Sequence, residues 1–200
     1  MVLASLSLTA CFSLKQPAAG ISYYTLEYDH SKVKEMEPLS RTIGIENFTV
    51  SPLYDSTGIV FKENEYLRDS YFYHKWRVNP GEMVTDLLTG DMRNAGVFRA
   101  VMPPGSRMTG VEYVLSGNVD KFYEESEDSQ WYGVISLSIS LIKEEESSPE
   151  KRILFQRSYS RKQICEKKNP RSLAKALSSA MQEISREILD DVYNRLKENK

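Results

Sequence analysis

The stretch YFYHKWRVNPGEMVTDLLTGDMRNAGVFRAVM, Tyr71 to Met102, predicts a strand, a capped helix and a second strand. The aromatic residues at its start favour a half-buried strand. Asn79 is a preferred N-cap and Pro80 suits the first helical position, while Glu82 stands where its side chain can reach back to the cap N–H. Gly96 follows the last turn, where a left-handed residue is favoured.

The predicted helix needs a sheet that can cover its apolar face. Its apolar residues recur at helical spacing, at Met83, Val84, Leu87 and Leu88. Before the central stretch, strands are expected over residues 21–28, 42–50 and 58–62. After it, three long runs alternate apolar and polar residues, most clearly from Ile135 to Leu141, where serine occupies every second position. Two hairpins in series predict an antiparallel meander with one serine-lined, wet side and one dry side for helices.

The chain ends with a predicted amphipathic helix. Asn169 and Pro170 repeat the start of the first helix, and apolar residues recur at three- and four-residue spacing from Leu173 to Leu196. Its polar face is mixed in sign, which favours packing on the sheet over binding to a membrane surface. The predicted fold class is therefore α+β, a mostly antiparallel sheet with two helices packed on one face, in a single domain over residues 21–200.

Composition excludes several classes of protein. The net charge of -2 lacks the basic excess of a nucleic-acid-binding domain, so no nucleic-acid partner is expected. The chain is 40% hydrophobic, which supplies a core and excludes a wholly disordered chain. No apolar run approaches the ~18 residues of a membrane-spanning helix. The two cysteines, Cys11 and Cys165, are too few for a disulfide framework or a cysteine-based zinc site.

The N-terminus carries a lipidation signal. Leu8-Thr9-Ala10-Cys11 ends an apolar run and matches the bacterial lipobox, in which a signal peptidase cuts before a cysteine that receives diacylglyceride. Residues 1–10 are then a signal peptide, Cys11 is the lipidation site, and residues 11–20 form a tether to the membrane. Phe12 in place of Asp favours the outer membrane over retention in the inner membrane. No Lys or Arg precedes Cys11, and a buried N-terminal strand is the alternative.

The sequence lacks the common catalytic motifs. It has no Gly-rich phosphate loop, no G-x-S-x-G elbow and no H-E-x-x-H, so we expect neither an enzyme nor a bound cofactor or metal. Cys165 stands among Lys162, Lys167 and Lys168, which would lower its pKa if they lie close. The alternative is an inert residue at a strand end. Two acidic runs fall in the expected hairpin turns, where such runs usually serve solubility.

Aromatic residues before the central helix form a candidate interaction surface. The group comprises Tyr66, Tyr71, Phe72, Tyr73 and Trp76. On a regular strand, Trp76 and Tyr73 face opposite sides. If Trp76 packs under the helix, Tyr71 and Tyr73 point away from it and form a candidate partner-binding pair. The alternative is that the preceding loop covers that face.

Several short features follow one another in a recognisable order. They are the lipobox at Cys11; the strand Tyr23-Tyr24-Thr25-Leu26; Tyr73, Trp76, Pro80 and Leu87; Ala95-Gly96-Val97-Phe98 with Val101; YVLSGNVDKF from Tyr113 to Phe122; and the last helix from Leu173 to Leu196. In this order they resemble the ABC-type transport auxiliary lipoproteins, which accompany MCE-domain (mammalian cell entry) lipid-transport systems of Gram-negative bacteria. The region from Leu53 to Tyr66 departs from the family pattern, because it lacks an arginine-containing Y-R strand.

The resemblance implies a periplasm-facing protein held on the outer membrane by a lipid anchor. It implies an MCE-domain protein as the partner, with the ABC permease and ATPase on separate chains, and it is compatible with ring-like homo-oligomers. The family brings no catalytic residues. Two other classes stay open: an outer-membrane assembly or secretion lipoprotein of similar build, and a periplasmic enzyme that uses Cys165 or an acidic pair. The genes that neighbour this one would separate the three.

Overall fold

The computed structural model describes residues 20–30, 36–106 and 110–198. These residues form an α+β fold with nine strands and three helices. The strands are β1 (Ser22–Tyr24), β2 (Leu39–Ile45), β3 (Thr49–Val50), β4 (Gly58–Lys62), β5 (Arg68–Trp76), β6 (Phe98–Met102), β7 (Tyr113–Glu127), β8 (Gln130–Lys143) and β9 (Ile153–Cys165). The helices are α1 (Pro80–Ala95), α2 (Pro149–Arg152) and α3 (Pro170–Glu198). The predicted signal peptide, the lipidation site Cys11 and all but the last residue of the tether lie outside the described residues.

The sheet is mixed, so the expectation of a mostly antiparallel sheet was wrong. The long meander β7–β8–β9 is antiparallel, as predicted, and so is the β4–β5 hairpin. The pairs β1–β5, β2–β6, β2–β7, β3–β7 and β4–β7 are parallel. Parallel strands need crossover connections, and α1 provides one that takes the chain from β5 to β6, which pairs with β2. Alternation along a strand shows which residues share a face, but it does not show which way the neighbouring strand runs.

Helix α1 begins and ends where its caps predict. The side-chain oxygen of Asn79 accepts a hydrogen bond from the Gly81 N–H at 2.8 Å. At the other end Gly96 adopts the left-handed conformation with φ 68°, and its N–H donates to the Arg93 carbonyl. Side chains with a Cβ resist this conformation, so glycine is the residue that ends the helix at least cost.

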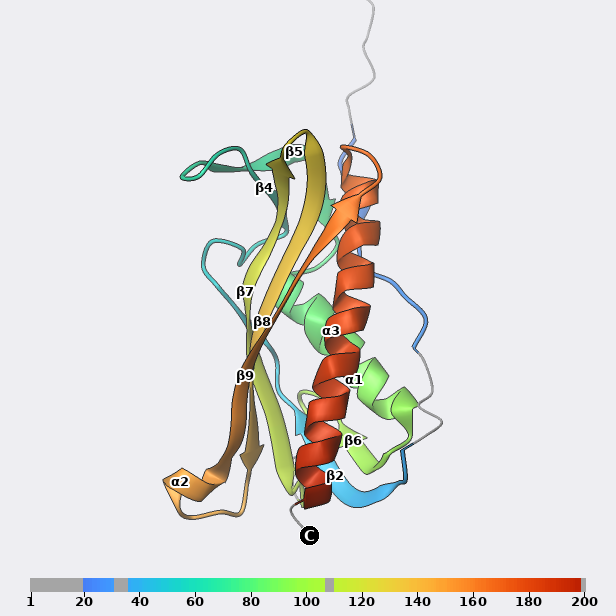
Figure 1. The fold of residues 1–200 in the computed structure, drawn as a ribbon, viewed down its shortest axis with the longest axis vertical. Coiled ribbons are helices and arrows are strands. Elements are labelled where there is room, and N and C mark those ends of the chain that lie inside the picture. The colour runs from blue at the N-terminus through green and yellow to red at the C-terminus, as the bar shows by residue number, and fades with distance from the viewer. Residues whose placement is uncertain (1–19, 31–35, 107–109, 199–200) are drawn as a thin grey trace, which may run out of the picture.

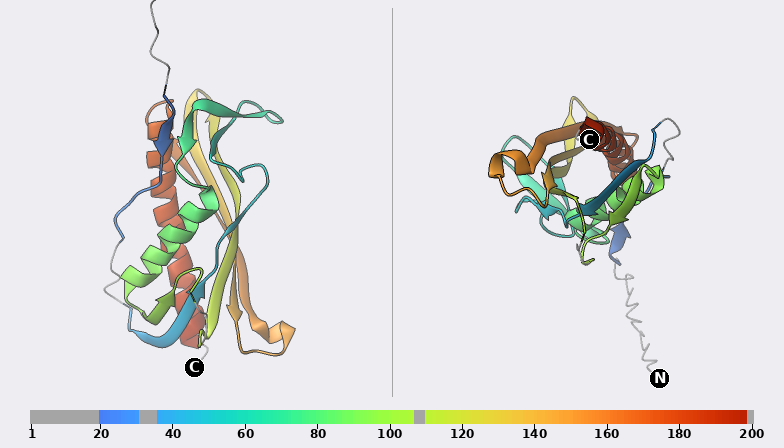
Figure 2. Two further views of the ribbon diagram at one scale, coloured as in Figure 1. Left: turned by 180° about the vertical axis from the view of Figure 1, so that it is seen from behind. Right: turned by 90° about the horizontal axis from the view of Figure 1, so that it is seen from below.

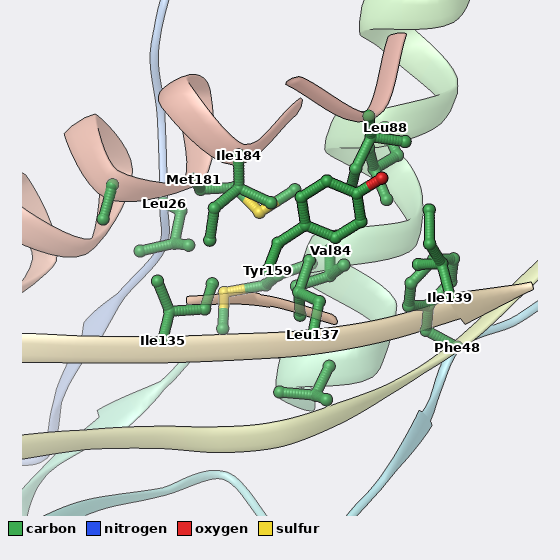
Figure 3. Packing of buried hydrophobic residues seen from close by; sticks show 14 of the residues in the cluster. Leu26, Phe48, Val84, Leu88, Ile135, Leu137, Ile139, Tyr159, Met181 and Ile184 are labelled. Carbon is green, nitrogen blue, oxygen red and sulfur yellow. The ribbon is translucent and has the colours of Figure 1, made fainter. Parts of the chain in front are cut away.

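Side chains of both long helices meet the central strands in one core (Figure 3). The residues shown there include Val84 and Leu88 of α1, Met181 and Ile184 of α3, Ile135, Leu137 and Ile139 of β8, and Tyr159 of β9. Tyr159 is 2% exposed, and its hydroxyl donates a hydrogen bond to the Asp191 carboxylate at 2.6 Å. The polar group of this buried ring therefore has a partner. The odd-numbered residues of β8 thus supply the dry side that their alternation predicts.

The molecule is elongated, with two different ends (Figures 1 and 2). The upper end of Figure 1 gathers β1, the β4–β5 hairpin, the β7–β8 turn and the start of α3. The lower end gathers α2, β2, β6 and the C-terminus. We use the names upper end and lower end in this sense below. The strand expected over residues 21–28 is shorter than predicted, because only Ser22–Tyr24 pairs with β5.

The segment after β1 is held against both long helices. The Tyr28 hydroxyl and the Ser185 hydroxyl donate to the Asp91 carboxylate at 2.7 Å and 2.5 Å, and His30 Nδ1 lies 2.6 Å from it. The Glu27 N–H donates to the Ser178 hydroxyl at 3.0 Å. One carboxylate of α1 therefore joins three segments that are far apart in the sequence.

Candidate interaction surface

Strand β5 contains an irregularity that decides which of its aromatic residues are exposed. Gly58 of β4 pairs with Lys75 of β5, but Val60 pairs with Ser70. Four residues of β5, Tyr71 to His74, therefore stand opposite one residue of β4. An excess of this kind breaks the alternation of a strand and re-aims its side chains.

Tyr71 and His74 turn inward. The Tyr71 ring lies 5.0 Å from the Phe61 ring and 5.9 Å from the His74 ring, measured between centroids. The Tyr71 hydroxyl donates to the Glu124 carboxylate at 3.1 Å, and the Tyr24 hydroxyl lies 3.0 Å from His74 Nδ1. The structure therefore does not bring Tyr71 and Tyr73 together on one exposed face. The prediction that both point away from the core was wrong for Tyr71.

Phe72 and Tyr73 turn outward instead. Their side chains are 80% and 47% exposed, and their rings meet edge to face with centroids 4.8 Å apart. Trp76 lies in the core at 1% exposure, as predicted, and its ring packs on Phe122 of β7. The outward pair is thus Phe72 with Tyr73. Phe72 and Tyr73 are consecutive in the sequence, and on a regular strand consecutive side chains point to opposite faces. Alternation along the strand therefore could not predict that both are exposed.

The tip of the β4–β5 hairpin presents two more apolar side chains. Tyr66 is 89% exposed and Leu67 is 48% exposed. The side-chain oxygen of Asn64 accepts the backbone N–H of both at 3.0 Å. The Arg68 guanidinium donates to the Asn64 carbonyl at 2.9 Å and to the Glu65 carbonyl at 3.3 Å. The hairpin tip is therefore held by its own side chains and exposes Tyr66 to solvent.

Strand β1 extends this surface alongside β5. Ile21 and Tyr23 are 46% and 53% exposed, and the Arg77 guanidinium lies 5.5 Å from the centre of the Tyr23 ring. We call Tyr66, Leu67, Phe72 and Tyr73, with Ile21 and Tyr23, the aromatic patch. Among the described residues, the other exposed large apolar side chains are Leu53, Ile153 and Ile164. The elements that carry the patch, β1 and the β4–β5 hairpin, lie at the upper end of the molecule (Figure 1), and exposed apolar side chains of this kind mark a candidate interaction surface.

Cys165 does not have the environment of a reactive thiol. Its side chain is buried beside the start of β8, where Cys165 pairs with Trp131. Burial, followed by the charge of Glu124, raises its pKa to about 11. Two of the three lysines expected to lower that pKa have other partners: Lys162 pairs with Glu125 and Glu127, and Lys168 lies over the Trp131 ring at 5.7 Å. The structure therefore supports the inert interpretation of Cys165.

The first acidic run is part of β7, not only of a turn. Glu124 is 4% exposed, and burial raises its pKa above the usual range of a carboxyl. Glu125 pairs with Lys62 and with Lys162, which ties β7 to β4 and β9. In residues 20–30, 36–106 and 110–198, no group of three or more His, Cys, Asp or Glu side chains is placed to hold a metal ion. The same ranges contain no helix long and apolar enough to span a membrane.

A family model described as "ABC-type transport auxiliary lipoprotein component" matches residues 24–189. No curated protein matches the chain. The fold is similar to that of protein XCC0632 from Xanthomonas campestris, of family model DUF330, with a TM-score of 0.78 and 16% identity over 89% of this chain and 98% of that one. A second structure, titled an uncharacterized protein, has a TM-score of 0.68 and 14% identity over 86% and 99% of the two chains.

A third structure is the hypothetical protein CT253 from Chlamydia trachomatis. Its TM-score is 0.54 at 10% identity, and the alignment covers 78% of this chain and 98% of that one. At such low identities these likenesses show the shared fold alone. The match to the family model runs from the last residue of β1 to residue 189 in α3, which is most of the described domain.

Proposed function

This chain belongs to the ABC-type transport auxiliary lipoprotein family, and on that premise we propose that it is the lipid-anchored auxiliary component of an MCE-associated lipid-transport system. It acts by binding and assembly, not by catalysis. Its partner is an MCE-domain protein, and the permease and ATPase are separate chains. The observation that carries the proposal is the family match over residues 24–189, which spans most of the described domain.

The proposed location is the outer membrane, with the domain facing the periplasm. Lipidation at Cys11 anchors the chain, and Phe12 after it favours the outer membrane over the inner one. From Cys11 to Ile21 a fully extended chain spans at most about 35 Å. The domain therefore stays within that distance of the bilayer and reaches a partner that extends across the periplasm. Self-association into homo-oligomers belongs to the same proposal.

Cross-linking in the native host tests the partnership. A tagged, full-length chain is cross-linked in living cells and purified from membranes, and the co-purified proteins are identified by mass spectrometry. We expect the MCE-domain protein, and through it the permease and ATPase. An unrelated tagged lipoprotein of the same membrane serves as the control. Recovery of outer-membrane assembly or secretion proteins in place of the MCE-domain protein would contradict the proposal and favour that second class.

A deletion experiment tests the shared function. Loss of this chain and loss of the MCE-domain protein should give the same change in outer-membrane permeability to detergent, and the double deletion should give no more. Additive defects in the double deletion would indicate that the two proteins act separately.

The proposed self-association is tested separately. The native mass of the purified lipidated chain in detergent measures its oligomeric state.

A further inference from the structure

We propose that the aromatic patch lies in the headgroup region of the membrane that holds the anchor, so that the domain stands on the bilayer with its upper end. The ligand of this surface is a phospholipid bilayer. The inference rests on the lipid anchor in the proposed function, but not on the MCE partnership. It gives the exposed residues of the aromatic patch a binding partner, which the proposed transport role does not.

The position of the patch relative to the anchor is the first argument. The first described segment, which contains β1, lies at the upper end together with the β4–β5 hairpin (Figure 1). Tyr23 of β1 pairs with Lys75 of β5, so the chain that leads back to Cys11 leaves beside the outward pair Phe72 and Tyr73. A tether that spans at most about 35 Å holds this end, and not the lower end, next to the lipids.

The chemistry of the side chains is the second argument. Tyrosine and tryptophan are enriched where a protein meets the membrane–water interface, because their rings are apolar and their polar atoms stay wet. The patch offers tyrosine at positions 23, 66 and 73, with Leu67 and Phe72 as fully apolar members. Close by, Arg77 lies over the Tyr23 ring and Lys168 over the Trp131 ring. Long cationic side chains that bury their stems on rings and keep their charge in water suit the same depth.

The rigidity of the patch is the third argument. Asn64 and Arg68 fix the hairpin tip, and the four-residue irregularity of β5 fixes Phe72 and Tyr73 outward. The backbone that carries these side chains is therefore held in place before any contact forms, so binding orders little additional chain. The domain does not need these apolar side chains on its surface in order to fold, and their exposure to water is unfavourable. Exposed apolar area of this kind indicates a surface that is covered in use.

The charges near the patch show which force holds it on the bilayer. Glu63, Glu65 and Asp69 flank the hairpin tip and offset the nearby cations. Attraction to anionic lipids is therefore weak, and insertion of the rings supplies the contact. We expect the same contact on vesicles of phosphatidylcholine alone and on vesicles of phosphatidylethanolamine with phosphatidylglycerol, with little response to salt.

Fluorescence quenching by brominated lipids tests the proposal on the full-length, lipidated chain reconstituted into those vesicles. Phe72→Trp places a reporter on the patch, and Tyr66→Trp is a second reporter at the hairpin tip. Ile153→Trp is the matched control, because Ile153 is 46% exposed at the start of β9 beside α2, at the lower end. Each signal is compared with that of the wild-type chain, which contains Trp76 and Trp131.

We expect the patch reporters to lose most of their added fluorescence on brominated vesicles, while Ile153→Trp keeps it. A second outcome is a chain that mass spectrometry shows to be diacylated at Cys11 but whose patch reporters are not quenched. That result would overturn the membrane contact and leave the lipid anchor in place. Shielding of Phe72→Trp only after the MCE-domain protein is added would assign the patch to that protein and overturn the proposal. An unmodified Cys11 would overturn both the anchor and this inference.

Discussion

The hydroxyl of Tyr71 lies 3.1 Å from the nearer carboxylate oxygen of Glu124, and this contact joins β5 to the central strand β7. Burial is the main cause that raises the pKa of Glu124, and the hydrogen bond from Tyr71 opposes it. Burial, followed by the charge of Glu124, raises the pKa of Tyr71. The tyrosine therefore remains protonated and donates, while the carboxylate is held in a place that disfavours its charge.

Glu124→Gln should stabilise the protein at neutral pH. A carboxyl with a higher pKa in the folded state binds its proton more tightly there, so the free energy of unfolding falls as the pH rises from the ordinary carboxyl value of about 4.3 through the raised one. The glutamine has no charge to bury and still accepts from Tyr71. We expect a gain on the order of 1 kcal/mol at neutral pH, and none at pH values below the ordinary carboxyl pKa.

Urea unfolding at a series of pH values measures this difference. Glu145→Gln is the control, because Glu145 is exposed in the turn after β8 and should give the same pH profile as the wild-type chain. A Glu124→Gln variant that is less stable than wild type at neutral pH would show that the carboxylate charge stabilises this region.

Substitutions in β5 should separate its buried aromatic residues from its exposed ones. Trp76→Ala should cost roughly 3–5 kcal/mol, because it removes a core side chain. Tyr71→Ala should cost about 1–3 kcal/mol, since it leaves the Glu124 carboxylate buried without its donor. Tyr73→Ala should stay within about 0.5 kcal/mol of wild type. Thermal melts followed by circular dichroism give the order, and equal stability of the two tyrosine variants would contradict the inward position of Tyr71.

The same strand shows where sequence patterns fail. Alternation predicted that Tyr71 and Tyr73 share a face, which holds only while a strand pairs residue for residue. Four residues of β5 opposite one of β4 remove that condition. Nothing local in the sequence marks this irregularity, because it depends on how Gly58 and Lys75 meet across the hairpin.

Signals that act over a few residues were reliable. Asn79 and Gly96 set the ends of α1, and serine alternation gave the dry side of β8, since each depends only on near neighbours. The parallel pairings of β2, β3 and β4 with β7 join residues that are far apart in the chain. The pattern of residues within a strand does not show where the chain goes between strands. For this reason the sequence predicted a mostly antiparallel sheet, and the parallel pairs were not expected.

Asp91→Asn should weaken the hold of the segment after β1 on the two long helices. The carboxylate accepts from Tyr28 and Ser185 and lies against His30, and only 13% of the Asp91 side chain is exposed. An amide accepts more weakly and sets an N–H against one of these donors, so we expect a loss of about 2 kcal/mol. Hydrogen exchange should rise in residues 25–30, whereas the exposed Asp86→Asn on the same helix leaves it unchanged. Unchanged exchange in Asp91→Asn would show that other contacts hold this segment.

The last prediction concerns Cys11. The chain belongs to a family of lipoproteins, and Leu8-Thr9-Ala10-Cys11 ends an apolar run. Mass spectrometry of protein from membranes of the native host should therefore show a mature chain that begins at Cys11 with a diacylglyceryl group. Two acyl chains supply the membrane affinity that a single chain does not. Cys11→Ser removes the thiol that takes the lipid, so this variant should remain unlipidated and uncleaved.

Cys165→Ser is the matched control, because Cys165 is buried and should carry no lipid. This variant should fractionate with membranes like the wild-type chain. Phe12→Asp tests the destination separately: on density gradients it should move the lipidated chain from the outer to the inner membrane. A chain from native membranes that starts at an unmodified Met1 would refute the anchor. A diacylated chain that is found in the inner membrane without the Phe12→Asp change would refute only the proposed location.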